Sequence, residues 1–104
     1  MFIVVVDHFC KPGRVDDAVA RIDGNGDQMA ELPGFLFRYR MTGTVNPLQM
    51  STVTAWTDQA AYDAWIARKR GLEAAAGPDS KGSPYEKAVN TTYTVAHVHG
   101  NALK

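Results

Sequence analysis

The sequence predicts an α+β domain whose elements follow the order β-α-β-β-α-β. Three observations support this class. Runs rich in β-branched and aromatic residues recur at strand length, and two longer stretches repeat apolar residues with the period of a helix. Short segments that contain Gly and Pro separate these elements and mark turns: Lys11-Pro12-Gly13, Leu32-Pro33-Gly34 and Gly77-Pro78.

A strand that leads directly into a helix forms the centre of the predicted domain. Met50–Trp56 is the strand, and Thr57 is expected to cap the helix that follows. The helix is expected to weaken near Gly71 and to end at Gly77 and Pro78. Its apolar residues recur at helical spacing and share one face: Ala61, Tyr62, Trp65 and Ile66.

The chain opens with a second strong strand prediction, Phe2–Cys10, which contains an Ile-Val-Val-Val run. This run is apolar on both faces at its start, so we expect it at the centre of the sheet. Arg14–Glu31 follows as a helix with one apolar face. Gly26 falls on that face, where the absent side chain permits close packing or leaves room for a ligand.

The other two strands are assigned from alternation and β propensity. Phe35–Met41 alternates between two faces, and a turn-like segment joins it to Met50–Trp56 as a hairpin. The last strand is placed within Ala88–Gly100. One face of Phe35–Met41 holds Phe35, Phe37, Tyr39 and Met41, and the other holds Leu36, Arg38 and Arg40.

This order is that of the ferredoxin-like fold, a four-stranded antiparallel sheet with two helices on one face. Right-handed crossovers are expected to place the first and third strands adjacent and parallel, with the fourth and second at the edges. The sheet carries too many large apolar residues for its uncovered face to stay wet. We therefore expect a homodimer in which two sheets pack face to face, forming a dimeric α+β barrel.

Length and composition limit the function classes. A chain of 104 residues suits one domain, residues 1–104, with a core of its own. Acidic and basic residues balance at eleven each, which gives no field that would favour nucleic acid or a membrane surface. The single cysteine, Cys10, suits a reducing compartment, and no signal peptide or transmembrane run is apparent. These features predict a cytoplasmic protein.

In their order and spacing, several motifs resemble the antibiotic biosynthesis monooxygenase family of the dimeric α+β barrel superfamily. They are the opening strand with Lys11-Pro12-Gly13, the Leu32-Pro33-Gly34-Phe35 junction, the run Val53–Asp58 leading to Tyr62 and Trp65, and the terminal strand Thr91–His97. The resemblance implies the dimeric barrel and cofactor-free oxygenation of quinol-like aromatics. One branch of the family instead breaks down haem oxidatively, so the resemblance also allows that activity.

The haem-degrading branch uses an Asn on the first strand, a Trp on the second helix and a later His as iron ligand. Trp65 matches the Trp. The first-strand position holds Val6 or Asp7, and the ligand position falls at Ala75 or Ala76. The leading prediction is therefore an enzyme without a cofactor, and haem binding through a non-standard ligand is the alternative.

His8 is the predicted catalytic base. On an alternating strand it shares a face with Val4, Val6 and Cys10. A histidine with a pKa of about 6.5 can accept a proton at neutral pH. Deprotonating a phenol or quinol gives an electron-rich anion that can pass an electron to O₂. The competing interpretation is a histidine at a strand end with no role.

The remaining candidates are substrate contacts. Trp65 is predicted to form a cavity wall that stacks on a flat substrate, or else to be a core aromatic. Arg38 is predicted to hold a substrate carboxylate or an enolate oxygen, or else to lie solvated on an edge strand. Tyr39 and Tyr93 are possible hydrogen-bond donors to the substrate, or else core residues.

A metal site is not predicted. His8-x-Cys10 and His97-x-His99 each place two ligand types on one strand face. Antiparallel pairing of the first and fourth strands, however, places the two pairs at opposite ends of the sheet. The sequence thus favours a homodimeric oxygenase that acts on a small aromatic molecule with O₂. The alternatives are a haem-binding or haem-degrading protein and a non-catalytic dimeric module that binds a small hydrophobic ligand.

Overall fold

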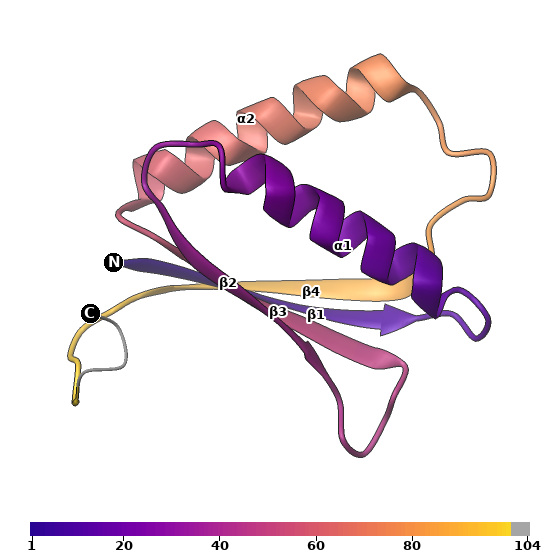
Figure 1. Cartoon of the computed structure of the whole chain (residues 1–104), viewed down its shortest axis with the longest axis horizontal. Coiled ribbons are helices and arrows are strands. Elements are labelled where there is room, and N and C mark those ends of the chain that lie inside the picture. The colour runs from indigo at the N-terminus through magenta and orange to yellow at the C-terminus, as the bar shows by residue number, and fades with distance from the viewer. Residues whose placement is uncertain (101–104) are drawn as a thin grey trace.

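The computed structural model describes residues 1–100. Its elements follow the predicted order: β1 (Phe2–Cys10), α1 (Val15–Met29), β2 (Phe35–Thr42), β3 (Gln49–Trp56), α2 (Gln59–Ala76) and β4 (Tyr85–Thr94). Both helices lie on one side of a twisted sheet, and the other side is bare (Figure 1). This arrangement confirms the ferredoxin-like fold. Within residues 1–100, no helix is long and apolar enough to cross a membrane.

The sheet has the strand order β2-β3-β1-β4, and every neighbouring pair is antiparallel. The first and third strands are adjacent, as predicted, but the expected parallel pairing between them is wrong. The crossover through α1 makes β1 parallel to β2 and leaves a gap of one strand between them. β3 fills that gap after a hairpin, and a hairpin reverses the direction of the chain.

β4 begins and ends earlier than the predicted range Ala88–Gly100. It is an edge strand whose partner is β1, so it extends only as far as β1 does. At one end Tyr85 pairs with Cys10, and at the other Thr94 pairs with Phe2. The N–H of Val95 makes a last bond to the carbonyl of Met1, at 3.0 Å.

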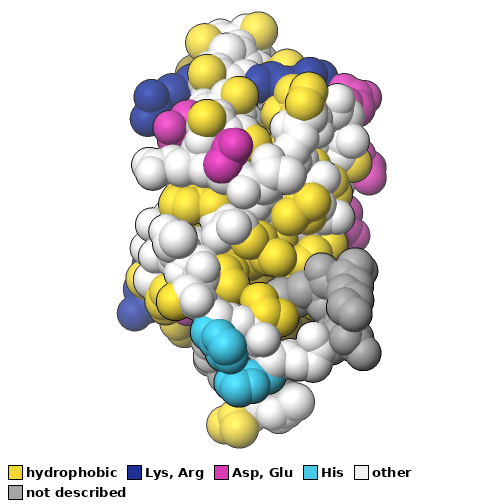
Figure 2. Space-filling model, turned by 90° about the vertical axis from the view of Figure 1, so that its left-hand side faces the viewer, with side chains coloured by type: hydrophobic (Ala, Val, Ile, Leu, Met, Phe, Trp, Pro, Cys, Tyr) yellow, Lys and Arg dark blue, Asp and Glu magenta, His cyan; other side chains and the backbone are white. Residues whose placement is uncertain are grey.

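His97 and His99 therefore lie beyond the strand rather than on it. Their rings contact each other, with centroids 4.4 Å apart in a T-shaped arrangement. Figure 2 shows histidine side chains together on the surface at this end of the molecule. His8 and Cys10 lie near the opposite end of β1, so the predicted separation of the two pairs is confirmed.

A register irregularity at the start of β2 corrects one predicted face. Phe35 was expected on the same face as Phe37, but the irregularity lies between these two residues. Phe35 packs on the helix side instead, edge-to-face with Trp56 at 5.6 Å between ring centroids. Farther along β2 the alternation holds, and Arg38 points toward the helices.

The cap of α2 also differs from the prediction. Asp58, rather than Thr57, is the N-cap, and its carboxylate accepts a 2.9 Å bond from the N–H of Ala61. The N–H of Thr57 donates instead to the carbonyl of Gly34, at 2.8 Å, and joins the start of β2 to the end of β3. Gly34 has a φ of +85°, and a Cβ there would lie 2.6 Å from the Cβ of Ala61. The C-terminus of α2 falls at Gly77, as predicted.

The buried core consists of two clusters that leave space between them. One surrounds Trp56 and Trp65, and the other joins Cys10 and Met50 of the sheet to α1. The apolar residues of α2 that pack on the first cluster end at Ile66. Beyond that point α2 rises away from the sheet (Figure 1). The helix side of the sheet is thus only partly filled.

Candidate functional site

A cavity of about 820 Å³ lies between the sheet and its own helices. This volume is in the range of sites for small organic ligands. Three predicted site residues, His8, Arg38 and Trp65, all line it. Tyr39 and Tyr93 do not: they lie on the bare face of the sheet, 56% and 54% exposed. The structure therefore brings together the predicted base, aromatic wall and cation, but not the two tyrosines.

His8 is held in one tautomer by the backbone. Its side chain is 8% exposed, and Nδ1 lies 3.1 Å from the carbonyl oxygen of Met50. A carbonyl oxygen only accepts hydrogen bonds, so Nδ1 carries a proton, and in the neutral ring Nε2 keeps its lone pair. The ring packs against that of Tyr85, with centroids 4.7 Å apart. His8 is thus a fixed, neutral imidazole with a free proton acceptor.

Burial lowers the pKa of His8 below its ordinary value of 6.5. The bond to Met50 opposes this shift, while the positive charges of Arg38 and Lys69 add to it. The lowered pKa keeps the imidazole unprotonated at neutral pH, which is the form that a general base requires.

Trp65 belongs to the core and to the cavity wall at the same time. Its side chain is 2% exposed and packs in the cluster with Trp56 and Phe2. It also lines the cavity, next to Ile66 on the same helix. The two interpretations drawn from the sequence are therefore compatible, because one face of an indole can pack on the core while its edge borders a ligand.

The two arginines of β2 have different environments. Arg38 is half-buried, and its Nε and Nη1 donate to Thr54 Oγ1 at 3.2 Å and to the carbonyl of Ile22 at 2.5 Å. Burial lowers the pKa of Arg38. Arg40 instead makes two bonds to the carboxylate of Asp23, at 2.8 and 3.3 Å, in a groove between α1 and β2. Of the two, Arg38 is the one that reaches the cavity.

Gly26 of α1 provides the space for Arg38. A Cβ at Gly26 would lie 3.2 Å from Arg38 Nη1, which is closer than most Cβ contacts. Of the two interpretations of this glycine, close packing is therefore the one observed. The packing partner is a guanidinium rather than an apolar side chain.

Two polar atoms in the cavity lining are buried without a partner. Thr52 Oγ1 and Trp56 Nε1 make no hydrogen bond within residues 1–100. An unpaired buried polar atom costs free energy, so native proteins contain few of them. Thr52 was not predicted as a site residue, although alternation backward from Trp56 through Thr54 places it on the helix side.

Sequence analysis also missed Tyr85, which stacks on His8. It precedes the predicted range of the last strand, Ala88–Gly100, and no local pattern links it to a residue on the first strand. Only the register that pairs Tyr85 with Cys10 brings the two rings together.

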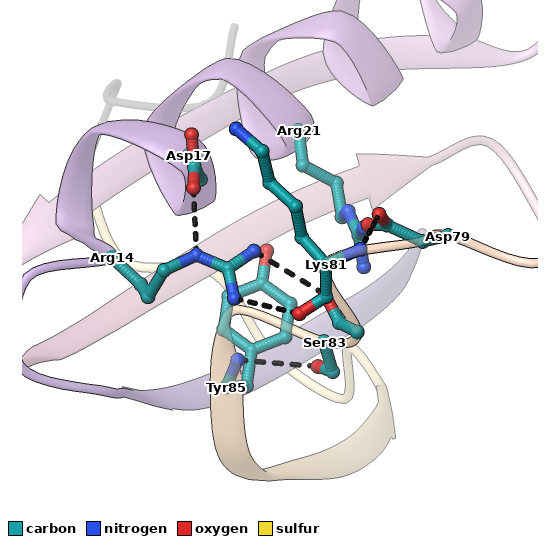
Figure 3. Close-up of polar contacts among 8 residues, drawn as sticks. Arg14, Asp17, Arg21, Asp79, Lys81, Ser83 and Tyr85 are labelled. Carbon is teal, nitrogen blue, oxygen red and sulfur yellow. Dashed lines mark hydrogen bonds and ion pairs between the residues drawn. The ribbon is translucent and has the colours of Figure 1, made fainter.

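The loop between α2 and β4 closes one end of the cavity through Pro78 and Asp79. Figure 3 shows how α1 holds this loop. Arg14 donates to the carbonyls of Lys81 and Gly82, at 3.2 and 3.3 Å. Arg21 pairs with Asp79 at 2.7 Å. The closure on this side thus depends on polar contacts rather than on core packing.

The chain belongs to the antibiotic biosynthesis monooxygenase family, whose model matches residues 1–76. Among solved structures it is similar to SnoaB, a cofactor-independent oxygenase from Streptomyces nogalater, at 13% identity and a TM-score of 0.76 over 93% of this chain and 94% of that one. It is also similar to the heme-degrader MhuD from Mycobacterium tuberculosis, at 19% identity and a TM-score of 0.72 over 96% of this chain and all of that one. A search of curated proteins finds no match. At these identities the solved structures support the fold.

The cavity lining does not fit standard haem ligation. Ala76, one of the two candidates for the ligand position of the haem-degrading branch, lines the cavity and offers no ligand atom. Among the described lining residues His8 is the single imidazole, and it is packed against Tyr85. Within residues 1–100 no three His, Cys, Asp or Glu side chains are grouped as a metal site would need.

Proposed function

We propose that the chain is a cofactor-independent monooxygenase that oxidises a small aromatic or quinol-like substrate with O₂. One observation carries the proposal: His8, whose Nε2 makes no hydrogen bond within residues 1–100, and Trp65 line the same cavity. The space is large enough for a fused aromatic ring system, and the open volume argues against a purely structural module.

In the proposed reaction His8 Nε2 takes the proton of a substrate hydroxyl or of an acidic C–H conjugated with it. The resulting anion transfers an electron to O₂, and the radical pair combines to form a C–O bond. The peroxide then takes up a proton. The attacked carbon, which is a CH₂ in the keto tautomer of the substrate, becomes a carbonyl when water is lost. One oxygen atom enters the product and the other leaves as water, so the substrate supplies all the electrons.

We further propose that residues 1–104 form one domain that acts as a cytoplasmic homodimer. The bare face of the sheet presents a band of apolar side chains at its centre, including Val5 and Val53, which are directly paired. Tyr39 and Tyr93 extend this band and are more than half exposed. Two such faces packed together would remove the apolar surface from water. The buried single thiol of Cys10 suits a reducing compartment.

Oxygen uptake with a panel of dihydroquinones tests the proposed activity. His8→Asn keeps a donor for Met50 but removes the base, and we expect a loss of about 10²–10⁴-fold in kcat/KM. His97→Asn is the matched control, because His97 lies outside the cavity. Unchanged uptake by His8→Asn would remove His8 from the reaction, and no uptake with any dihydroquinone would count against the oxygenase.

Haem binding is the second candidate, favoured by the imidazole in the cavity and by the likeness to MhuD. A haemin titration followed by absorbance tests it. A saturable Soret shift at one haem per subunit, lost in His8→Asn and kept in His97→Asn, would identify His8 as the ligand. If neither oxygen uptake nor a Soret shift is observed, the remaining alternative is a non-catalytic module that binds a small hydrophobic ligand.

A further inference from the structure

We infer that the cavity selects planar aromatic molecules that carry a carboxylate, and that Arg38 binds this carboxylate. The inference names the substrate class of the proposed oxygenase and so rests on that proposal. Ligand binding, however, can be measured without turnover, which separates a failure of one from a failure of the other.

The first argument is that Arg38 makes no direct ion pair within residues 1–100, since the carboxylate of Asp23, whose charge acts on Arg38, is already bound by Arg40. None of the ion pairs in that range includes Arg38, although its side chain is half-buried. Its partners are a hydroxyl oxygen of Thr54 and a backbone carbonyl of Ile22, both neutral. The Ile22 carbonyl lies inside α1, where an amide N–H one turn later is already its helical partner. A buried cation without a counter-ion is costly, and a bound anion would remove that cost.

The second argument is the geometry of the free donors. A guanidinium has five N–H groups, and Arg38 uses one on Nε and one on Nη1. The remaining three lie at the Nη1–Nη2 end. Two parallel N–H groups at this end match the two oxygens of a carboxylate, which is the bidentate pairing that arginine favours.

The third argument is the balance of charge around the cavity. The acidic residues in the described lining already have cationic partners: Asp79 pairs with Arg21 at 2.7 Å, and Glu73 lies 3.8 Å from Lys69. Arg38 is left as the net charge of the interior.

The positions of Arg38 and His8 separate the carboxylate from the reacting hydroxyl. Arg38 is paired with Thr54 and His8 with Met50, four residues apart along β3, or about 13 Å of strand. The two side chains therefore approach a ligand from different ends. A flat molecule with a carboxylate at one end and a hydroxyl at the other satisfies both.

Tryptophan fluorescence with an unreactive pair of ligands, 2-naphthoate and 2-naphthamide, tests the inference. The two ligands share shape and differ in charge, and both tryptophans line the cavity. We expect the wild-type protein to bind 2-naphthoate at least about ten-fold more tightly, as charge-assisted hydrogen bonds imply. Arg38→Gln should abolish this preference with little change for the amide, and Arg40→Gln should keep it.

Gly26→Ala is a second variant, which keeps the charge: its Cβ would lie 3.2 Å from Arg38 Nη1, so the guanidinium has to shift by a few tenths of an ångström. If Arg38→Gln fails to fold, Gly26→Ala replaces it as the test, and it should reduce the preference for 2-naphthoate. Equal affinities in the wild-type protein, or an equal loss of preference in Arg38→Gln and Arg40→Gln, would overturn the inference. A preserved preference without any oxygen uptake would instead overturn the oxygenase and leave the carboxylate site intact.

Discussion

The two faces of one sheet have opposite characters in this protein. The face toward the helices buries polar groups, among them His8, Thr52 and Thr54, around a partly empty cavity. The opposite face is bare and exposes large apolar side chains such as Tyr39 and Tyr93. This is the reverse of a simple sheet with one wet polar face and one dry apolar face.

The difference follows from what each face has to contact. The helices cover the face toward them, the inner face, incompletely, so its polar groups can contact a ligand in the cavity. Nothing within residues 1–100 covers the bare, outer face, and its apolar residues need a partner to leave water. Neighbouring residues of one strand, such as His8 and Phe9, therefore lie on faces of different character.

The largest effect is expected from a charge at the centre of the outer face. Val53→Glu would bury a carboxylate in each half of the proposed dimer, and each unpaired buried charge costs about 3–5 kcal/mol. We expect the dimer to dissociate at micromolar concentration, as measured by analytical ultracentrifugation. Val45→Glu, in the exposed β2–β3 connection, is the control and should leave association unchanged. A Val53→Glu protein that associates like the wild type would mean that this face is not the interface.

The inner face is expected to depend on the first half of α2 for its stability. Trp65→Ala should lower the free energy of unfolding by about 3–5 kcal/mol, because it empties a buried site in the core. Leu72→Ala, two turns later and 44% exposed, should cost no more than about 1 kcal/mol. Urea denaturation measures both. Similar losses for the two variants would show that the second half of α2 packs on the core after all.

The fold was largely predictable because its signals are local and periodic. Alternation and β propensity located β1 to its end residues, and the glycine after α2 located the end of that helix. Alternation also grouped His8 with Val4 and Val6 on one face of β1, and all three line the cavity. These features depend on neighbours in the chain, so the sequence contains them.

The errors arose where long-range pairing decides the structure. The end of β4 is set by the first residue of β1, and the face of Phe35 is set by an irregularity opposite β3. The contact of Tyr85 with His8 and the support of Arg38 by Gly26 each join segments far apart in the chain. No local pattern encodes such pairs. Tyr39 and Tyr93 lie on the bare face of the sheet, outside the cavity, and their contact with a substrate stays a prediction.

The burial of His8 should give the inner face a pH-dependent stability. Its pKa is lowered in the folded state, whereas in the unfolded chain it is about 6.5. As the pH falls below that value, the unfolded state binds a proton that the folded state does not. Stability should therefore fall with the pH until the folded pKa is reached, by at most about 1.4 kcal/mol per pH unit.

His8→Asn removes this titration and should flatten the acid side of the stability curve, measured by urea denaturation between pH 7 and pH 5. His97→Asn is the matched control, because it removes an imidazole outside the cavity. If both variants changed the slope equally, the burial of His8 would not be its cause.

The smallest effect is expected at the loop that closes the inner face. Asp79→Asn removes the charge that pairs with Arg21, while an asparagine oxygen can still accept the 2.9 Å bond from the N–H of Lys81. Both side chains of the pair are exposed, so the change in unfolding free energy should stay below about 1 kcal/mol and vanish at high salt.

The same change bears on ligand exchange, because Asp79 lines the cavity and Asp17, which pairs with Arg14 at the N-cap of α1, does not. Stopped-flow fluorescence should show 2-naphthoate dissociating about two- to five-fold faster from Asp79→Asn at low salt, and at the wild-type rate from Asp17→Asn. Salt would then affect ligand release from the inner face, which exposed ion pairs close. It would affect association through the apolar outer face much less. Equal dissociation rates in both variants would place the route of ligand exit elsewhere along the cavity, over the exposed side chains of β4 that line it, Ala88 and Asn90.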